Sequence, residues 1–123
     1  MDIRIIGTSF SVCKLNCLCN ADELSPYCFL SVTDEEISLV CPTDRTPENT
    51  SAREDGWSML RIEGQLDFSL IGILAGISKV LADNGIAIFA ISTYNTDYIL
   101  TRTEQFDKAL SVLRAAGYNI IGE

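Results

Sequence analysis

Residues Asp67–Asp97 have the sequence DFSLIGILAGISKVLADNGIAIFAISTYNTD, and this stretch predicts a helix followed by a strand. Apolar side chains recur at three- and four-residue steps over Leu70–Leu81, which predicts an amphipathic helix with one side on a core. Asn84–Gly85 ends this helix, because glycine readily takes the left-handed conformation of a C-terminal cap. The next run, Ile86–Ile91, is apolar on both faces and therefore predicts a central strand.

The flanking segments complete an alternation of strands and helices. Trp57–Glu63 predicts the strand before the helix, and Tyr98–Thr101 predicts the strand after the polar loop Ser92–Asp97. Glu104–Ala116 predicts a second amphipathic helix, and Tyr118–Ile121 predicts the last strand. The resulting order is β-α-β-β-α-β, which is typical of the ferredoxin-like plan with two helices on one face of an antiparallel sheet.

The N-terminal part of the chain predicts strands but little helix. Ile3–Leu15 predicts an opening strand interrupted near Gly7, and Phe29–Thr33 with Ile37–Cys41 predicts a hairpin. Pro42–Gly56 lacks the apolar residues that would bind it to a core and predicts a surface linker. We therefore expect an α+β protein of two ferredoxin-like units. The first unit is abbreviated and, with its linker, covers residues 1–55; the second is complete and covers residues 56–123.

Composition and charge argue against several classes of partner. The chain has 123 residues, nine Lys and Arg, and a net charge of −8, whereas nucleic-acid affinity rests on clustered cations that neutralise phosphates. Nucleic acid and anionic membranes are therefore not expected as partners. No uninterrupted apolar run is long enough for a membrane span, and no basic region with a following apolar run opens the sequence. We expect a cytoplasmic protein.

The cysteines and the missing histidine bear on metal binding and catalysis. The five cysteines are Cys13, Cys17, Cys19, Cys28 and Cys41; none forms a CxxC pair, and the chain has no histidine. The sequence therefore predicts neither a metal site nor a disulfide scaffold, and Cys13 and Cys41 fit small buried strand residues. No glycine-rich phosphate loop or histidine base is present, so we expect no cofactor and no enzyme activity.

Three strings resemble those of ACT domains, the small regulatory modules that bind amino acids in metabolic enzymes. They are LDFSLIGIL at Leu66–Leu74, NGI at Asn84–Ile86 and ISTYNTDYIL at Ile91–Leu100, followed by the closing helix. The resemblance is greatest to the ACT-like proteins related to aspartate kinase regulatory domains and to cytosolic arginine sensors. The resemblance is strong over Gly56–Gly117 and weaker over the first half of the chain. The resemblance implies two ACT-like units, an amino-acid ligand and a homodimer.

The resemblance also implies a ligand site where the loop entering the first helix meets the loop after the second strand. In this chain those loops are Asp67–Gly72 and Ser92–Asp97. The N–H groups and dipole at a helix start suit a ligand carboxylate, while the Asp97 carboxylate suits an ammonium or guanidinium group. The expected ligand-binding residues are Asp67, Phe68, Ser69, Leu70, Ile71, Gly72, Thr93, Tyr94, Asn95 and Asp97.

These residues also have purely structural interpretations. Gly72 can serve helix packing, Asp67 can cap the helix, and Asp97 can satisfy loop amides. Leu70 stands where the arginine sensors carry an acidic residue, so the resemblance does not extend to arginine as the ligand. The alternative function is a dimerisation or protein-interaction module without a small ligand. A small hydrolase on the same fold is less favoured, because the loops are acidic or neutral.

Overall fold

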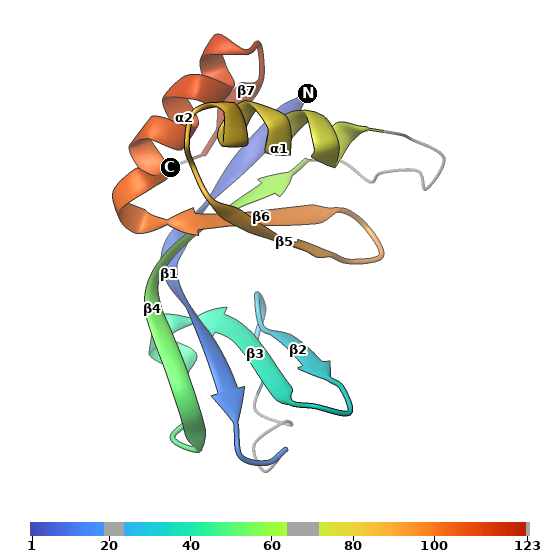
Figure 1. Cartoon of the computed structure of the whole chain (residues 1–123), viewed down its shortest axis with the longest axis vertical. Helices are drawn as coiled ribbons and strands as arrows, with labels where there is room; N and C mark the ends of the chain where they lie inside the picture. Colours follow the sequence, from blue (N-terminus) through green and yellow to red (C-terminus); the bar gives the residue numbers. More distant parts are fainter. Residues whose placement is uncertain (19–23, 64–71, 123) are drawn as a thin grey trace. The chain divides into compact units, whose positions relative to one another are not determined.

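The computed structural model describes residues 1–18, 24–63 and 72–122, which form two compact units (Figure 1). Unit 1 consists of Met1–Gly7 and Ser58–Glu123, and unit 2 consists of Thr8–Trp57. The division predicted between residues 55 and 56 stays a prediction. The observed units differ from it in two respects: the first seven residues supply a strand to unit 1, and residues 56–57 belong to unit 2.

Two long strands, β1 (Asp2–Leu15) and β4 (Thr50–Ile62), contribute residues to both units. They run antiparallel. In unit 2 the Asn16 N–H donates to the Asn49 carbonyl at 2.9 Å, and in unit 1 the Glu63 N–H donates to the Asp2 carbonyl at 2.9 Å. The strand predicted to break near Gly7 is continuous, because this backbone pairing holds β1 along its length.

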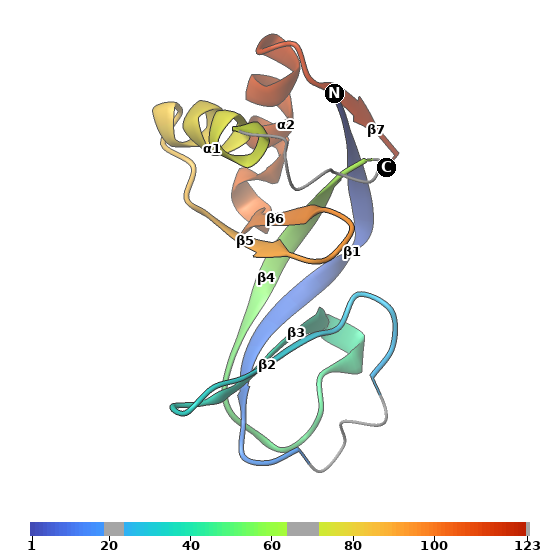
Figure 2. The same cartoon turned by 90° about the vertical axis from the view of Figure 1, so that its right-hand side faces the viewer.

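Unit 1 packs two helices on one face of a sheet with the strand order β7-β1-β4-β6-β5 (Figures 1 and 2). The β-α-β-β-α-β order predicted for this part is confirmed, but β1 lies between β4 and β7 and pairs with β7 in parallel. The elements that follow β4 are α1 (Ile73–Asp83), β5 (Ile88–Ser92), β6 (Asp97–Arg102), α2 (Phe106–Ala115) and β7 (Asn119–Ile121).

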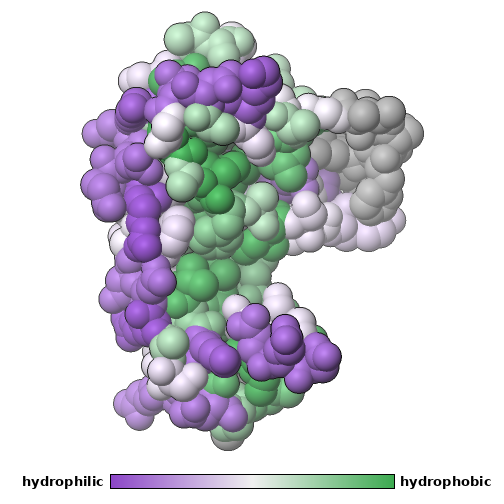
Figure 3. Space-filling model, viewed as in Figure 1, coloured by the Kyte–Doolittle hydropathy of each residue, from purple (hydrophilic) through white to green (hydrophobic). Residues whose placement is uncertain are grey.

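The apolar stripes of both helices build the core of unit 1. Ile77 and Leu81 of α1 join Leu113 of α2 in one cluster with strand residues that include Leu60 and Ile99, and all five are fully buried. Figure 3, viewed as Figure 1, shows hydrophilic residues along the upper and left-hand edges of unit 1 and hydrophobic residues between α1 and the β5–β6 hairpin. This division between apolar and polar sides is the pattern that directs a helix onto a sheet. None of the described helices is long and apolar enough to span a bilayer.

The predicted end of α1 is confirmed by its backbone. Gly85 has a φ of 74°, and its N–H donates to the Ala82 carbonyl at 3.0 Å. The Ile86 N–H reaches back to the Leu81 carbonyl at 2.9 Å. These bonds satisfy carbonyls at the end of the helix and turn the chain toward β5.

Unit 2 is a sheet with the strand order β2-β3-β1-β4. It adds β2 (Phe29–Val32), β3 (Ile37–Pro42) and the short 3-10 helix η2 (Thr43–Arg45), and its described residues contain no α-helix. Among its described residues, the buried apolar side chains include Phe10, Cys13, Leu39, Val40 and Cys41. The prediction that Cys13 and Cys41 are small buried strand residues is therefore confirmed.

The prediction of a surface linker over Pro42–Gly56 is wrong. Pro42 belongs to β3, and β4 begins at Thr50. The side chains of residues 51–55 are exposed, so composition alone did not reveal the strand. Backbone pairing and polar bonds hold it instead, including the bond from Ser11 Oγ to Asp55 Oδ1 at 2.5 Å.

The hairpins β2–β3 and β5–β6 repeat each other at sequence positions 60 apart. Leu30 pairs with Leu39 in the first, and Ala90 pairs with Ile99 in the second. Each hairpin closes through a threonine whose N–H bonds the carbonyl three residues later. These bonds measure 3.0 Å for Thr33 to Glu36 and 2.9 Å for Thr93 to Thr96. The sequence has no letter-by-letter repeat, so the structure reveals a correspondence that the residues alone do not.

The correspondence extends past each hairpin to a 3-10 helix, η2 in unit 2 and η3 (Thr103–Gln105) in unit 1. The first threonine of each helix lies close to a serine on a neighbouring strand. The Oγ–Oγ1 distance is 2.9 Å for Ser11 and Thr43 and 3.0 Å for Ser58 and Thr103. Unit 2 therefore resembles the β-rich part of unit 1.

Candidate functional site

The first part of the predicted site is the start of α1. Gly72 precedes the helix in the left-handed region, with a φ of 81°, and its carbonyl accepts the Gly76 N–H at 2.8 Å. Glycine has no side chain that could bond the N–H groups of the first turn, so Gly72 itself leaves them open to another acceptor. The predicted residues Asp67, Phe68, Ser69, Leu70 and Ile71 lie outside the described residues.

The second part is the loop between β5 and β6, which is held by threonines. The Thr93 N–H and Oγ1 both donate to the Thr96 carbonyl, at 2.9 and 3.0 Å. Thr96 is buried, and its Oγ1 donates to the Ile62 carbonyl of β4 at 2.7 Å. Tyr94 is 76% exposed and Asn95 is also exposed. The loop is thus anchored to the sheet while its tip faces solvent.

Asp97 begins β6 at the base of this loop, opposite Ser92. The Ser92 hydroxyl donates to Asp97 Oδ1 at 2.6 Å. The carboxylate is half-buried, and within the described part of the chain no hydrogen bond reaches its second oxygen, Oδ2. Asp97 therefore keeps acceptor capacity for a cationic group.

Figure 1 shows the start of α1 and the β5–β6 loop at the same end of unit 1. Gly72 precedes the first of these elements, and the predicted residues Thr93, Tyr94, Asn95 and Asp97 belong to the second or to its base. This end combines the positive end of a helix dipole with a carboxylate. The arrangement can recognise a molecule that carries both a negative and a positive group.

A model of the ACT domain family matches residues 52–115, which is more than half of the chain. The chain belongs to the ACT domain family. The matched residues of this ACT domain run from β4 to the end of α2 and contain every predicted site residue.

Solved structures share the fold of this ACT-domain chain. The Agobacterium tumefaciens protein Atu0741 has a TM-score of 0.87 at 28% identity, covering 99% of this chain and 92% of its own. The Vibrio cholerae protein VC0802, described as a possible transport protein, has a TM-score of 0.72 at 21% identity. The match covers 93% of this chain and 88% of VC0802. The ligand-free regulatory subunit of aspartate kinase from Thermus thermophilus has a TM-score of 0.66 at 10% identity. The match covers 94% of this chain and 96% of that subunit.

A charged cluster of unit 1 escaped the sequence prediction. Glu63, which follows β4, accepts hydrogen bonds from Arg4 Nε at 2.9 Å and from Arg61 Nε at 2.8 Å. These two bonds hold the pKa of the Glu63 carboxyl below its usual value, and the bond from Arg4 has the larger effect. Arg61 and Glu63 lie two residues apart at the end of the predicted strand Trp57–Glu63, so the sequence places them on one face, which was a usable signal. Arg4 lies outside the residues matched by the ACT domain model, and its approach depends on β1.

Within residues 1–18, 24–63 and 72–122, no group of three His, Cys, Asp or Glu side chains is placed to hold a metal ion. Burial raises the pKa of the Cys13 thiol and raises that of Cys41 to about 11. Thiols with raised pKa values are weak nucleophiles and weak metal ligands at neutral pH. The buried cysteines of this ACT-domain protein therefore act as packing groups.

Proposed function

We propose that this ACT-domain chain is a regulatory module that binds a free amino acid on unit 1. The ligand carboxylate lies at the N–H groups that begin α1, and the ligand ammonium is bonded by Asp97. The observation that carries this proposal is the position of the Asp97 carboxylate, at the base of an anchored loop that lies at the same end of unit 1 as the glycine-capped helix.

Energetics support a site built from these groups. A hydrogen bond to a charged partner contributes roughly 1.5–3 kcal/mol, and a helix start adds a smaller dipole term. Two such interactions with opposite ends of one zwitterion favour amino acids over simple amines or carboxylates. The residues proposed to form the site are Asp67, Phe68, Ser69, Leu70, Ile71, Gly72, Thr93, Tyr94, Asn95 and Asp97.

We further propose that the chain contains two ACT-like units, of which unit 2 is abbreviated. The common register of β2–β3 and β5–β6, the 3-10 helix after each and the serine–threonine pair at each support this assignment. The role of such a tandem is regulatory rather than catalytic.

A homodimer is the proposed assembly. β5 lies at one end of the strand order in unit 1, and β2 lies at one end in unit 2. A strand at such an edge offers backbone groups that can pair with a second copy. Sedimentation at high micromolar concentration is expected to give a dimer, and a monomer there would refute the assembly.

A thermal-shift panel of the twenty amino acids tests the function. One or a few are expected to raise the unfolding temperature, because a ligand at 100 times its dissociation constant adds about 2.7 kcal/mol to stability. If none of the twenty does so, the amino-acid proposal fails. The chain would then be better assigned as a dimerisation or protein-interaction module.

A further inference from the structure

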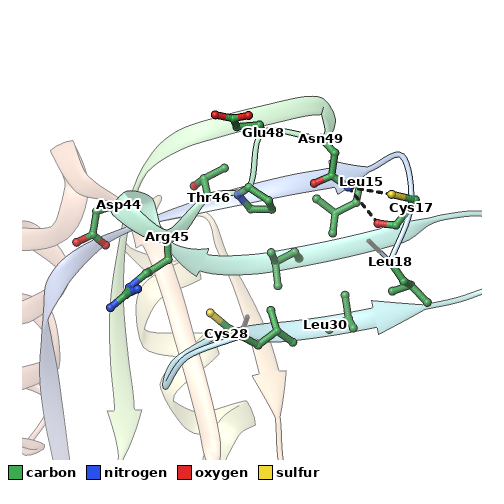
Figure 4. A pocket seen from close by; sticks show the side chains of 13 residues that line it. Leu15, Cys17, Leu18, Cys28, Leu30, Asp44, Arg45, Thr46, Glu48 and Asn49 are labelled. Atoms are coloured by element: carbon green, nitrogen blue, oxygen red, sulfur yellow. Dashed lines mark hydrogen bonds between the residues drawn. The ribbon is translucent and has the colours of Figure 1, made fainter. Parts of the chain in front are cut away.

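Unit 2 contains a cavity of about 450 Å³, a size typical of small-molecule sites (Figure 4). It lies among the end of β1, the β2–β3 hairpin and the segment after η2. Its lining includes Leu39, which occupies the hairpin position of Ile99 in unit 1. Ile99 packs in one cluster with residues of α1 and α2, whereas the described residues of unit 2 supply no α-helix to cover Leu39.

The apolar side of the cavity is formed by leucines. Leu15, Leu30 and Leu39 come from three strands, while Leu18 and Leu24 lie in the connecting segment. Leu18 is 46% exposed and Leu24 is 41% exposed, which is high for side chains of this type. An apolar molecule in the cavity would remove part of this leucine surface from water.

One polar group of the cavity lacks a partner. Asn49 Nδ2 donates to the Cys17 carbonyl at 3.2 Å and to Cys17 Sγ at 3.4 Å, which fixes the orientation of the amide. Asn49 Oδ1 is then buried, and no hydrogen bond reaches it from the described residues. A buried acceptor without a donor is unfavourable, so a ligand N–H group at this position would be favoured.

The charges on the lining favour a cation. Asp44 and Glu48 each carry a carboxylate and Arg45 carries one guanidinium, and none of the three forms an ion pair with another described residue. Figure 4 shows Glu48 beside Asn49 at one end, and Arg45 beside Asp44 at the other. The end with the unpartnered oxygen therefore has an excess of negative charge.

We infer that unit 2 binds an apolar primary amine, a molecule with an ammonium group on a branched alkyl or aromatic chain. The ammonium donates to Asn49 Oδ1 and is attracted by Glu48, and the apolar chain lies against the leucines. An α-amino acid fits less well, because its carboxylate is adjacent to its ammonium and would be repelled by Glu48. This site is separate from the amino-acid site proposed on unit 1.

Nitrogen-15 NMR titration with isopentylamine tests the inference on the full chain. Amide signals of residues 15–18, 24–30 and 44–49, other than Pro26 and Pro47, are expected to shift, while those of the β5–β6 loop stay in place. Isopentanol, which has the same chain without the charge, and L-leucine are each expected to bind about fivefold or more weakly. Shifts confined to unit 1, no shifts at all, or equal binding of isopentanol would overturn the inference.

Two exposed positions allow variants that preserve the fold. Leu18→Ser removes part of the apolar wall and is expected to weaken amine binding about fivefold. Glu48→Gln removes the carboxylate that attracts the ammonium and is expected to weaken amine binding about threefold. Val32→Ser is the matched control, because Val32 is 58% exposed in unit 2 and lies outside the cavity lining. Asp97→Asn is also expected to leave amine binding unchanged, which separates this site from that of unit 1. Equal losses in Leu18→Ser and Val32→Ser would contradict the proposed site.

Discussion

The hairpins and 3-10 helices of the two units correspond, and their backbones diverge directly after the 3-10 helices. In unit 1 the residue after η3, Phe106, has φ −64° and ψ −44°, and the chain continues into α2. In unit 2 the corresponding residue, Thr46, has φ −66° and ψ 125° and is followed by Pro47. Proline disfavours the helical conformation in the residue before it. The comparison indicates that Pro47 is compatible with the same hairpin but opposes a helix in the place of α2.

The units are consequently stabilised in different ways. Unit 1 buries the stripes of two helices against its sheet. Unit 2 buries fewer large apolar side chains and uses polar bonds within its sheet, with fully buried Ser11 donating to Asp55 and lying 2.9 Å from Thr43. Unit 1 therefore depends mainly on packing, and unit 2 depends more on directed hydrogen bonds.

Truncating one buried leucine in each unit should give the largest difference. Leu113→Ala in unit 1 is expected to lower the free energy of unfolding by about 3–4 kcal/mol, because it opens a void between α2 and the sheet. Leu39→Ala in unit 2 is expected to cost about 2 kcal/mol, because Leu39 already borders a cavity. Urea unfolding at equal protein concentration measures both. If Leu39→Ala lowered the free energy of unfolding as much as Leu113→Ala does, the proposed difference in stabilisation between the units would be wrong.

Removing the serine of each serine–threonine pair tests the polar side of the comparison. Ser11→Ala is expected to cost about 1–2 kcal/mol, since it leaves Asp55 and Thr43 without their buried partner. Ser58→Ala is the matched control in unit 1 and is expected to cost less than about 0.5 kcal/mol, because its bond to Thr103 is exposed. Urea unfolding of the two variants should rank them in this order, and the reverse order would refute it.

The smallest expected effect concerns acid stability. The pKa of Glu63 is lowered by Arg4 and Arg61, and that of Asp55 is lowered mainly by Arg53. Each carboxylate stabilises the fold fully above its unfolded pKa, and this contribution is lost as the pH falls through the lower folded pKa. The Glu63 side chain is 23% exposed and that of Asp55 is 54% exposed, so solvent screens the Asp55 pair more.

Glu63→Gln should therefore flatten the decline of stability at acidic pH more than Asp55→Asn does. Unfolding in urea between roughly pH 3 and pH 7 measures the slope for each variant. An unchanged slope for Glu63→Gln would show that its arginine pairs do not contribute to acid stability.

The sequence predicted unit 1 well because its signals are local. The spacing of Leu70–Leu81 and the glycine at 85 were sufficient to predict α1 and its end, and the stripe of the second helix predicted its packing. The insertion of β1 beside β7 was not predictable in this way. Residues Asp2–Arg4 pair with Asn119–Ile121 at the other end of the chain, and no local pattern encodes that contact.

Unit 2 was harder to predict because its stability does not come from apolar periodicity. The start of β4 has exposed polar side chains, so it was mistaken for a linker. For the candidate site, ordinary residue chemistry and the family resemblance indicated Asp97 and Gly72, while the anchoring of the loop by Thr96 to the Ile62 carbonyl became visible only in the fold. The unpartnered oxygen of Asn49 likewise results from a contact with Cys17 that is distant in sequence.

Calorimetric titration tests the central claim, amino-acid binding on unit 1, most directly. Wild type, Asp97→Asn and the control Asp34→Asn are titrated with the amino acid that gives the largest thermal shift. Asp34 is an exposed acid in the corresponding loop of unit 2, so the control makes the same charge change. Asp97→Asn is expected to bind at least about tenfold more weakly, with Asp34→Asn equal to wild type. Equal affinities for wild type and Asp97→Asn would contradict the proposed site.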